Sequence, residues 1–546
     1  MHTLPERIYD SLAIGGTVTL IDGDEATTVP WTEIHEDAKA MAADLQVRGV
    51  APGSHVAVLG PTSRRLITGI EAVWLAGGTV VVMPLPMRMG SIDEFIDQTR
   101  RRLTSAEVSL LLIDHQLAPF IEPAPSDPPM VVLDQVVGDP TAFRAPKVSP
   151  TSLAILQFTS GSTSDPKGVA LPHHTVCANL DAMAEAVDFD PRVDVLVSWL
   201  PLYHDMGLVG MLTVPMTMGC DLVLAGPQDF MAAPARWMQW LSTYRGTVTA
   251  GPNFAWVLAT RSLRQADETL DLSAVRIALN GAEPVDPDTV EKLVDAGARH
   301  GFRPGAVFPA FGMAETAIGA TFPEPGRGLR TDPVDLRVLE TERYAAPSDP
   351  DAAGTRRLVK LGRPLPGLEI RIVDPESGHV RAEREVGELQ IRGTSVTPGY
   401  YKHRSATEAA FDGDWLRTGD LAYLADGELV LCGRIKDVII VAGRNVFPED
   451  VERAVADVEG VRAGNVVAFG VEGRQGRETM VVVAETKADD LSPVRDAVAK
   501  RVKDAIGLPA HEVVLVSPGT LPKTSSGKLQ RSLARTRYLA EELQPV

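Results

Sequence analysis

The apolar run Leu153-Ala154-Ile155-Leu156-Gln157-Phe158 is followed directly by Thr159-Ser160-Gly161-Ser162-Thr163-Ser164-Asp165-Pro166-Lys167-Gly168. The first six residues have the length and composition of a buried strand. The following loop of small hydroxyl residues and glycine can direct several N–H and O–H donors at one anion, and Lys167 adds a positive charge suited to phosphate. GxxxxGK[ST] does not fit, so the loop is not a P-loop. We interpret it as a phosphate-binding loop in an α/β fold; an ordinary polar turn is the alternative.

Short apolar runs and amphipathic stretches alternate on the N-terminal side of this loop. The apolar runs include Val56–Leu59, Thr79–Met83 and Ser109–Ile113, and the amphipathic stretches include Ile34–Arg48 and Ile92–Leu103. Buried strands alternating with helices predict an α/β architecture with largely parallel sheets. The pattern continues to about residue 361. It predicts a large α/β body that consists of either one lobe or two.

After residue 367 the apolar runs no longer alternate with amphipathic helices. A small β-rich section is expected from the runs Leu368–Val373, Gly387–Arg392 and Glu428–Cys432. A compact α+β pattern follows, with the expected elements Val438–Val441 (strand), Pro448–Val455 (helix), Gly464–Phe469 (strand), Thr479–Thr486 (strand), Ser492–Ile506 (helix) and Glu512–Val516 (strand). We therefore predict an N-terminal domain of residues 1–433 and a small C-terminal domain of residues 434–546.

The bulk properties exclude several classes of protein. The chain has 546 residues, more than one hydrophobic core normally serves, so at least two domains are expected. Its composition, 44% hydrophobic and 23% charged, is that of an ordinary soluble protein. A net charge of −19 argues against nucleic acid or an anionic membrane surface as the main partner. Cys177, Cys220 and Cys432 have no zinc or disulfide spacing, which favours a cytoplasmic protein. The apolar stretches Ile70–Met87 and Met206–Leu224 are interrupted by glycine and proline, so no integral membrane segment is expected.

Two further motifs have residue types that suit a nucleotide. Phe311-Gly312-Met313-Ala314-Glu315-Thr316 can place an aromatic face beside a purine and a carboxylate on Mg²⁺; the alternative is an aromatic-glycine turn with a surface glutamate. Arg417-Thr418-Gly419-Asp420 is expected in a turn, where the aspartate can accept both ribose hydroxyls; a plain hairpin turn is the alternative.

Three later or intervening segments add charged side chains. Gly433-Arg434-Ile435-Lys436-Asp437 precedes the α+β region, and Leu521-Pro522-Lys523-Thr524-Ser525-Ser526-Gly527-Lys528-Leu529 reads as an exposed polar loop with a lysine at its tip, or simply a solvated loop. In Ser198–Leu208, His204 stands beside Asp205 and can orient an acid, or the two can form a structural pair. The apolar run Val209–Val214 suits either a fatty-acyl tunnel or core packing.

In their order and spacing, these segments resemble the adenylate-forming superfamily of acyl-CoA synthetases, peptide-synthetase adenylation domains and luciferases. The resemblance covers nearly the whole chain. It implies an acetyl-CoA synthetase-like fold with a large N-terminal domain, a small mobile C-terminal domain and an active site between them.

The resemblance also implies residue roles. Thr159, Ser160, Gly161, Ser162 and Thr163 would hold the β- and γ-phosphates with Lys167, and Glu315 would bind Mg²⁺ together with Thr159. The adenine would lie against Gly281, Ala282, Glu283, Phe311, Gly312, Met313 and Ala314. Asp420 and Arg434 would hold the ribose, and Lys436 would be the hinge. Lys528 would be the catalytic lysine, and His204 would act in the acyl pocket.

Within the superfamily, three details resemble the fatty acyl-AMP ligases. Ala314 stands where CoA ligases commonly carry threonine, and no clear CoA-binding basic cluster is found. The interval from Glu315 to Leu361 is about 45 residues, longer than in typical CoA ligases. We expect an insertion at about residues 325–358, thought in this branch to hinder the domain rotation that admits CoA. Its Ala/Pro/Asp-rich part, Ala345–Gly354, is alternatively a disordered loop.

The expected function is thus ATP- and Mg²⁺-dependent activation of a medium- or long-chain fatty acid to its acyl-adenylate. The acyl group would then pass to the phosphopantetheine thiol of an acyl carrier protein or polyketide synthase on a separate chain. A fatty acyl-CoA ligase is the alternative within the family. A non-catalytic nucleotide- or lipid-binding member is the alternative of another class.

Overall fold

The computed structural model of the chain describes residues 2–85, 92–158, 167–267, 269–473, 478–523 and 528–543. The predicted phosphate loop, Thr159 to Thr163, lies outside the described residues. The chain divides into two compact units. Unit 1 comprises Met1–Leu329, Gly362–Glu369 and Arg392–Asp414, and unit 2 comprises Arg330–Leu361, Ile370–Ile391 and Trp415–Val546.

The first sheet of unit 1 contains the strand that precedes the predicted phosphate loop. Its order is β6-β5-β3-β4-β7-β8, parallel except for the antiparallel pair β7–β8. The strands are β3 His55–Leu59, β4 Thr79–Val82, β5 Leu110–Ile113, β6 Met130–Val132, β7 Leu153–Phe158 and β8 Gly168–Pro172. β3, β4 and β5 are buried along their whole length, because helices cover both faces of a parallel sheet.

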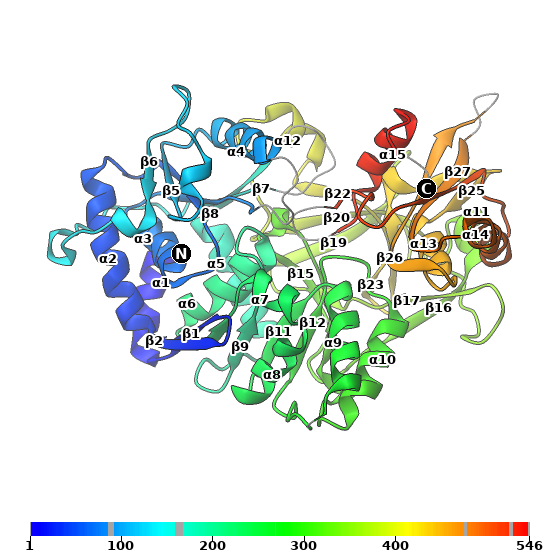
Figure 1. Ribbon diagram of the computed structural model, residues 1–546, viewed down its shortest axis with the longest axis horizontal. Helices are drawn as coiled ribbons and strands as arrows, with labels where there is room; N and C mark the ends of the chain where they lie inside the picture. The colour runs from blue at the N-terminus through cyan, green and yellow to red at the C-terminus, as the bar shows by residue number, and fades with distance from the viewer. Residues whose placement is uncertain are drawn as a thin grey trace. The chain divides into compact units, whose positions relative to one another are not determined.

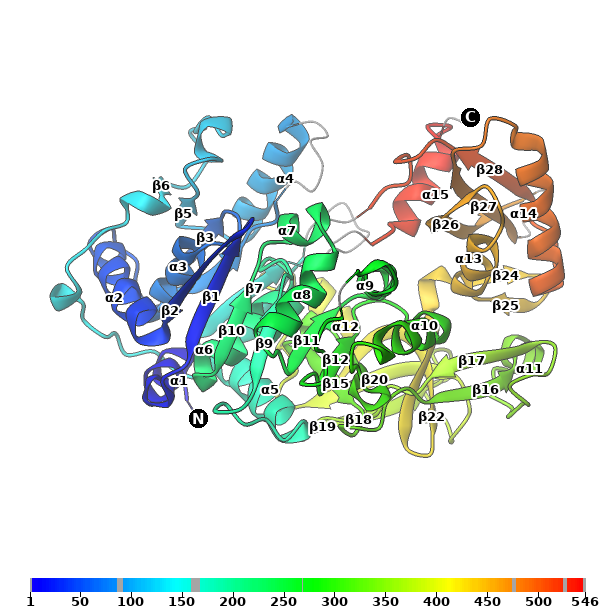
Figure 2. The same cartoon turned by 60° about the horizontal axis from the view of Figure 1, so that its bottom comes forward.

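The second sheet of unit 1 has the order β13-β12-β11-β9-β10-β1-β2, with only β1–β2 antiparallel. Its strands are β1 Thr17–Asp22, β2 Glu25–Pro30, β9 Val195–Ser198, β10 Asp221–Leu224, β11 Val248–Gly251, β12 Ile277–Asn280 and β13 Val307–Pro309. Helices α8, α9 and α10 lie side by side along this sheet (Figures 1 and 2). The large α/β body predicted from the alternating pattern is therefore built on two separate, mainly parallel sheets.

The helices of unit 1 cover these sheets. They are α1 Leu4–Ser11, α2 Trp31–Val47, α3 Arg64–Leu75, α4 Ile92–Ser105, α5 His173–Ala186, α6 Val214–Met218, α7 Pro227–Ala232, α8 Ala235–Thr243, α9 Asn253–Gln265, α10 Pro287–Ala298 and α12 Arg404–Ala410. A small antiparallel sheet, β14 Phe311–Gly312, β15 Gly319–Phe322 and β18 Arg363–Pro364, follows β13. None of the helices in the described ranges is long and apolar enough to cross a bilayer.

Unit 2 begins with the segment predicted to be an insertion. β16 Thr331–Asp335 and β17 Thr355–Val359 form an antiparallel hairpin, with α11 Leu336–Glu342 between them. A larger antiparallel sheet contains β19 Leu368–Val373, β20 Gly387–Gly393, β22 Trp415–Ala425 and β23 Glu428–Arg434; short β21 Phe411–Asp412 extends it. These helix and strand elements flank the Ala/Pro/Asp-rich part, Ala345–Gly354, and the insertion itself stays a prediction.

The turn expected at Arg417–Asp420 is not found. These residues lie inside β22, opposite a register shift in β20: Gln390 pairs with Arg417 and Glu388 with Leu421. The extra residues form a bulge in which the Thr418 hydroxyl donates to the Leu389 carbonyl at 2.8 Å. Gly419 has a φ of +72°, a conformation in which glycine is not strained and which made the sequence resemble a turn.

The C-terminal part of unit 2 has two apolar faces on one sheet. β26 Val461–Glu472, β27 Glu478–Thr486 and β28 Glu512–Val516 pair in that order, beside the small hairpin of β24 Ile439–Val441 and β25 Arg444–Val446. Val466 and Ala468 pack with α13 Pro448–Ala456 and α14 Leu491–Ile506. Val467 and Phe469 instead pack with α15 Arg531–Leu539. The period of two along a strand accounts for this alternation.

The two units divide the chain differently from the predicted boundary between residues 433 and 434. Unit 2 also contains the β16–β17 hairpin, β22, β23 and most of β19 and β20. Arg356 of β17 contacts Cys432 before that boundary and Asp450 after it, and Glu340 of α11 contacts Arg444 after it. These contacts explain why the segments belong to one unit. The boundary itself stays a prediction.

Candidate functional site

The predicted adenine walls lie at the carboxyl ends of two adjacent parallel strands. β12 pairs with β13, and the Ala310 N–H donates to the Asn280 carbonyl at 3.0 Å, so Gly281 and Phe311 leave the sheet side by side. Ligands of α/β sheets typically bind at such carboxyl ends. Gly312 has no room for a side chain, since an added Cβ would lie 1.9 Å from the Ile318 carbonyl oxygen.

Two alanines near these walls adopt left-handed backbone conformations. Ala282 has a φ of +69° and Ala317 a φ of +63°. Such conformations are strained for alanine and cluster at functional sites. Beside Ala282, the Glu283 carboxylate accepts a 2.6 Å hydrogen bond from the Phe254 N–H at the start of α9. These contacts hold the backbone after β12 in one arrangement.

Glu315 lies in a 3₁₀ turn, Ala314–Thr316, that begins one residue after β14 Phe311–Gly312. The residue is 8% exposed, and the Tyr400 hydroxyl donates to its Oε1 at 2.8 Å. Burial is the main cause that raises the pKa of Tyr400, and the negative charge of Glu315 raises it further. The Tyr400 hydroxyl is therefore protonated and is the donor. A partly enclosed carboxylate is the kind of oxygen ligand that Mg²⁺ takes beside substrate phosphates, so Glu315 fits the predicted metal role.

Lys167 directly precedes β8, and it lies over the face of the Tyr400 ring. Its Nζ is 5.5 Å from the centroid of the Tyr400 ring, within the range of a cation–π contact. The segment of Tyr400 is held against β8, because the Tyr401 N–H donates to the Gly168 carbonyl at 2.9 Å. Lys167 and the end of β7 therefore bracket the predicted phosphate loop.

His204 lies beside Asp205, as the pair interpretation expects. His204 Nδ1 is 2.6 Å from Asp205 Oδ1, and both side chains are mostly buried. The Gln157 amide, on β7, donates to the Tyr203 carbonyl at 2.9 Å and links this segment to the strand before the phosphate loop. Burial raises the pKa of Tyr203 to about 12. The position of His204 suits an acyl-pocket role, which stays a prediction.

The apolar run that follows His204 forms most of a π-helix, Met206–Thr213. Its residues are almost all buried. π-helical turns are rare and occur frequently at functional sites. Both interpretations of this run, as an acyl tunnel and as core packing, are compatible with its burial.

In unit 2, Asp420 and Arg434 face each other across the β22–β23 pair. Arg434 Nε is 3.1 Å from Asp420 Oδ1; Asp420 is 5% exposed, whereas half of the Arg434 side chain is exposed. Lys436 lies two residues beyond Arg434 in a 3₁₀ turn, Ile435–Asp437, and burial lowers its pKa. The predicted ribose pair and the predicted hinge are therefore neighbours.

Lys528 directly precedes Leu529, one partner of an antiparallel bridge. Lys523 and Leu529 form an antiparallel bridge, and the Gln530 N–H donates to the Pro522 carbonyl at 2.9 Å. Arg531, at the start of α15, ion-pairs with Asp437 at 2.6 Å and is also held by Glu449 and Glu452. The loop carrying Lys528 is thus attached to the residue that follows the predicted hinge.

The predicted site residues therefore form two groups, one in each unit. Lys167, Glu315 and the adenine walls belong to unit 1, whereas Asp420, Arg434, Lys436 and Lys528 belong to unit 2. The sequence reasoning missed Tyr400 and Arg531. Tyr400 lies in none of the motifs singled out in the sequence, and Arg531 lies three residues after Lys528, just beyond the run that ends at Leu529. The sequence does not show what either side chain contacts.

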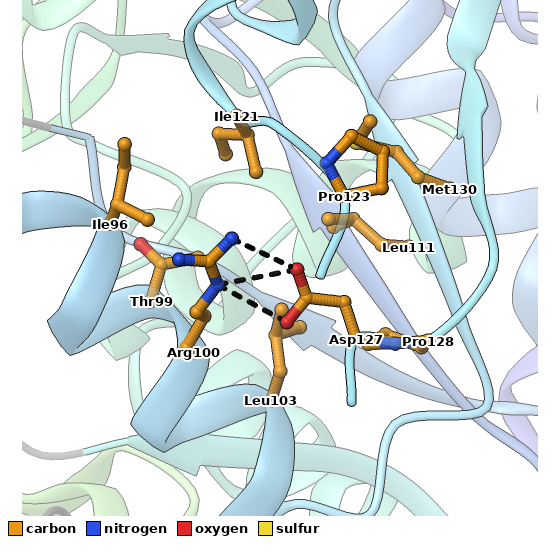
Figure 3. Close-up of a pocket in the computed structure, with 10 residues that line it drawn as sticks. All are labelled: Ile96, Thr99, Arg100, Leu103, Leu111, Ile121, Pro123, Asp127, Pro128 and Met130. Carbon is orange, nitrogen blue, oxygen red and sulfur yellow. Dashed lines mark hydrogen bonds and ion pairs between the residues drawn. The ribbon is translucent and has the colours of Figure 1, made fainter. Parts of the chain in front are cut away.

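No group of three or more histidine, cysteine, aspartate or glutamate side chains suited to a metal ion occurs among the residues that the structure describes. Figure 3 shows a small cavity beneath α4, where the Arg100 guanidinium is hydrogen-bonded to the Asp127 carboxylate at 3.2 Å. Its volume of about 10 Å³ corresponds to one water molecule, and no predicted site residue lines it. This cavity is therefore not a candidate substrate site.

The model of the AMP-binding enzyme family matches residues 13–401, and the model of the AMP-binding enzyme C-terminal domain matches residues 443–535. The first match alone covers more than half of the chain. This chain belongs to the AMP-binding enzyme family. The membership of the adenylate-forming superfamily and the α/β fold class predicted from the sequence are both confirmed.

Individual relatives and solved structures resemble this chain over nearly its whole length. The Mycobacterium tuberculosis protein Rv1013 is 39% identical over 97% of this chain and 99% of its own length. The medium-chain-fatty-acid–[acyl-carrier-protein] ligase JamA of Moorena producens is 32% identical over 94% of this chain and 90% of its own length. A structure from a study of fatty acyl-adenylate ligases of E. coli and L. pneumophila superposes with a TM-score of 0.90, at 29% identity over 99% of this chain and 98% of that one. The chain is thus an AMP-binding enzyme that is similar to fatty acyl-AMP ligases.

Proposed function

We propose that this enzyme activates a medium- or long-chain fatty acid with ATP, releasing pyrophosphate. It then transfers the acyl group from the acyl-adenylate to the phosphopantetheine thiol of an acyl carrier protein or polyketide synthase, and AMP leaves. The observation that supports the adenylation half best is the cluster of Glu315, Tyr400 and Lys167. It brings a carboxylate suited to Mg²⁺ and an ammonium group suited to phosphate to one tyrosine.

The binding roles in this proposal follow the two groups of residues. In unit 1, Lys167 and the loop Thr159–Thr163 would hold the β- and γ-phosphates, and Glu315 with Thr159 would hold Mg²⁺. Gly281–Glu283 and Phe311–Ala314 would enclose the adenine. In unit 2, Asp420 would accept hydrogen bonds from the ribose hydroxyls, with Arg434 beside it. Bound Mg²⁺ would neutralise part of the negative charge of the triphosphate.

The chemistry requires charge compensation more than proton transfer. A fatty acid is already ionised at neutral pH, so its carboxylate oxygen can attack the α-phosphorus without a general base. The bond from the α-phosphorus to the oxygen bridging to the β-phosphate breaks, and its electron pair leaves with pyrophosphate. Two anions approach each other in this step, and a lysine at the reacting phosphate offsets their repulsion. We assign that lysine to Lys528 and the orientation of the acid to His204.

The choice of a carrier protein as acceptor is supported by the contacts of the insertion. Glu340 of α11 ion-pairs with Arg444, and its backbone carbonyl accepts from the Asn445 amide at 2.8 Å. Arg356 of β17 ion-pairs with Asp450 of α13 at 2.8 Å. Insertion residues precede the proposed hinge Lys436 and their partners follow it, so these contacts would oppose the rotation that admits CoA. The name of JamA, a ligase to acyl carrier protein, agrees with this acceptor.

Product analysis tests both halves of the proposal. The purified chain is incubated with α-³²P-labelled ATP, Mg²⁺ and a series of fatty acids of increasing length, with and without CoA. We expect labelled acyl-AMP that persists when CoA is added and disappears when a phosphopantetheinylated carrier protein is added.

Each other outcome identifies an alternative. Conversion to acyl-CoA with release of AMP would make this enzyme a fatty acyl-CoA ligase and leave the insertion without its proposed role. ATP binding without acyl-AMP, for every acid tested, would support a non-catalytic nucleotide-binding member and contradict the proposal.

A further inference from the structure

Tyr400 connects two charged side chains that the sequence places far from it. Its hydroxyl donates to Glu315 Oε1 at 2.8 Å, and the two residues are 85 positions apart. The face of its ring lies 5.5 Å from Lys167 Nζ. A single side chain therefore contacts both the proposed Mg²⁺ ligand and the proposed phosphate-binding lysine.

The backbone around Tyr400 is fixed from two directions. On one side, the Thr397 N–H donates to the carbonyl of Glu315 at 2.7 Å. On the other, the Thr397 hydroxyl donates to the Ala170 carbonyl at 2.5 Å, and the Ala170 N–H donates to the Gly399 carbonyl at 3.0 Å. These hydrogen bonds attach one short segment both to the turn that carries Glu315 and to β8. The backbone that carries Tyr400 is therefore fixed relative to both Glu315 and β8.

We propose that Tyr400 is a positioning residue for the magnesium–nucleotide part of the site, an inference that rests on the proposed function. Its hydroxyl orients the Glu315 carboxylate for the metal, and its ring holds the Lys167 ammonium in place. Hydrogen bonds from a neighbouring group commonly fix the orientation of a metal ligand, and their loss costs about 10- to 100-fold in metal affinity. Tyr400 touches neither the fatty acid nor the acceptor in this scheme.

The chain offers a matched control for the test. Tyr401, the next residue, also donates its hydroxyl to a glutamate, but to Glu107 at 3.1 Å on an exposed surface. Tyr400→Phe and Tyr401→Phe therefore each remove one phenolic hydroxyl bound to one carboxylate. Only the first of these carboxylates is a proposed metal ligand. Tyr400→Leu additionally removes the ring beneath Lys167.

The experiment measures ATP binding by calorimetry in Mg²⁺ and in EDTA, together with the KM values for ATP and for the fatty acid. For Tyr400→Phe we expect the Mg²⁺ concentration for half-maximal enhancement of ATP binding to rise about 10-fold or more. ATP affinity in EDTA and the KM for the fatty acid should stay within about twofold of wild type. Tyr400→Leu should also weaken ATP binding in EDTA, since Lys167 loses its ring contact. Tyr401→Phe should behave as wild type.

Several results would overturn this inference. They are equal Mg²⁺ dependence of Tyr400→Phe and Tyr401→Phe, an equal loss of ATP affinity with and without Mg²⁺, or a loss seen only in the KM for the fatty acid. The proposed function fails separately: a wild-type chain that binds no ATP contradicts both, whereas a wild-type chain that forms acyl-AMP while Tyr400→Phe is unaltered contradicts only the role of Tyr400. Because Tyr400→Phe adds no atoms and keeps the ring, it decides the question even if Tyr400→Leu does not fold.

Discussion

Arg356 on β17 and Asp450 on α13 form a buried ion pair of 2.8 Å, in which their side chains are only 5% and 8% exposed. The same guanidinium donates to the Cys432 carbonyl at 3.0 Å and lies 4.7 Å from the centroid of the Phe447 ring. Burial raises the pKa of Asp450, and the positive charge of Arg356 opposes that rise. One arginine of the predicted insertion thus joins the strand before the proposed hinge to the helix after it.

Removal of one partner of this ion pair should destabilise the folded state. We expect Arg356→Met to lower the free energy of unfolding by about 3 kcal/mol, because it leaves the Asp450 carboxylate buried without its counter-charge. Urea unfolding of the purified variant measures the change. The double variant Arg356→Met with Asp450→Leu should recover most of the loss, since an apolar pair of similar volume removes the buried charge as well. A double variant as unstable as the sum of its single variants would show that the pair is not the cause.

Deletion of the insertion should change the choice of acceptor. The Leu336 N–H donates to the Gly354 carbonyl at 3.0 Å, so a short linker can replace residues 336–354 while β16 and β17 remain. This removes Glu340 and its bond to Arg444. We expect acyl-CoA formation to rise about 10-fold or more, an ordinary size for a coupling between sites, while acyl-AMP formation changes little. Glu340→Ala should give a smaller rise. A folded deletion variant with no gain in acyl-CoA would remove the gating role of the segment.

Replacement of Lys528 tests the assignment of the catalytic lysine. Loss of one charge that stabilises a transition state typically costs about 10²- to 10³-fold in rate. We therefore expect Lys528→Ala to lower the rate of acyl-AMP formation by at least this factor, whereas ATP binding measured by calorimetry stays close to wild type. Lys523→Ala is the control, since Lys523 lies on the opposite strand of the same hairpin and is exposed. Turnover of Lys528→Ala close to that of wild type would exclude the proposed mechanism.

The buried pair of His35 and Glu71, in the core between α2 and α3, should make stability depend on pH. Glu71 Oε1 is 2.6 Å from His35 Nδ1, and the Glu71 side chain is 1% exposed. Burial raises the pKa of Glu71, with His35 opposing the rise, so the folded state holds this proton more tightly than the unfolded state. That stabilisation is complete below the unfolded pKa of about 4.3 and is lost as pH rises through the folded value.

Glu71→Gln removes this titration while it keeps the shape of the side chain. The stability of the variant relative to wild type should therefore increase with pH above about 4.3, by up to about 1.4 kcal/mol for each unit of pKa shift, and then level off. Urea unfolding at a series of pH values gives the difference. A difference that stays constant with pH would contradict the raised pKa of Glu71.

Much of the local structure follows from residue type and periodicity. The expected strand Glu512–Val516 is β28, and the expected helix Ser492–Ile506 is α14 with one more residue at its start. Asp420 and Arg434 were paired through the family resemblance, and the antiparallel strands β22 and β23 place them opposite each other. The turn expected at Arg417–Asp420 was wrong, because a bulge inside a long strand uses the same glycine and polar residues as a turn.

The sequence by itself determined the α/β class, the family and the chemical groups available to a nucleotide, since these depend on short runs such as Leu153–Phe158 and on motifs such as Phe311–Thr316. The tertiary structure decided which distant side chains meet. Tyr400 meets Glu315 from 85 positions away, and Arg356 meets Asp450 across the proposed hinge. Periodicity encodes which face of a strand or helix is buried, whereas the partner on that face depends on the order of strands and on the packing of segments far apart in the chain.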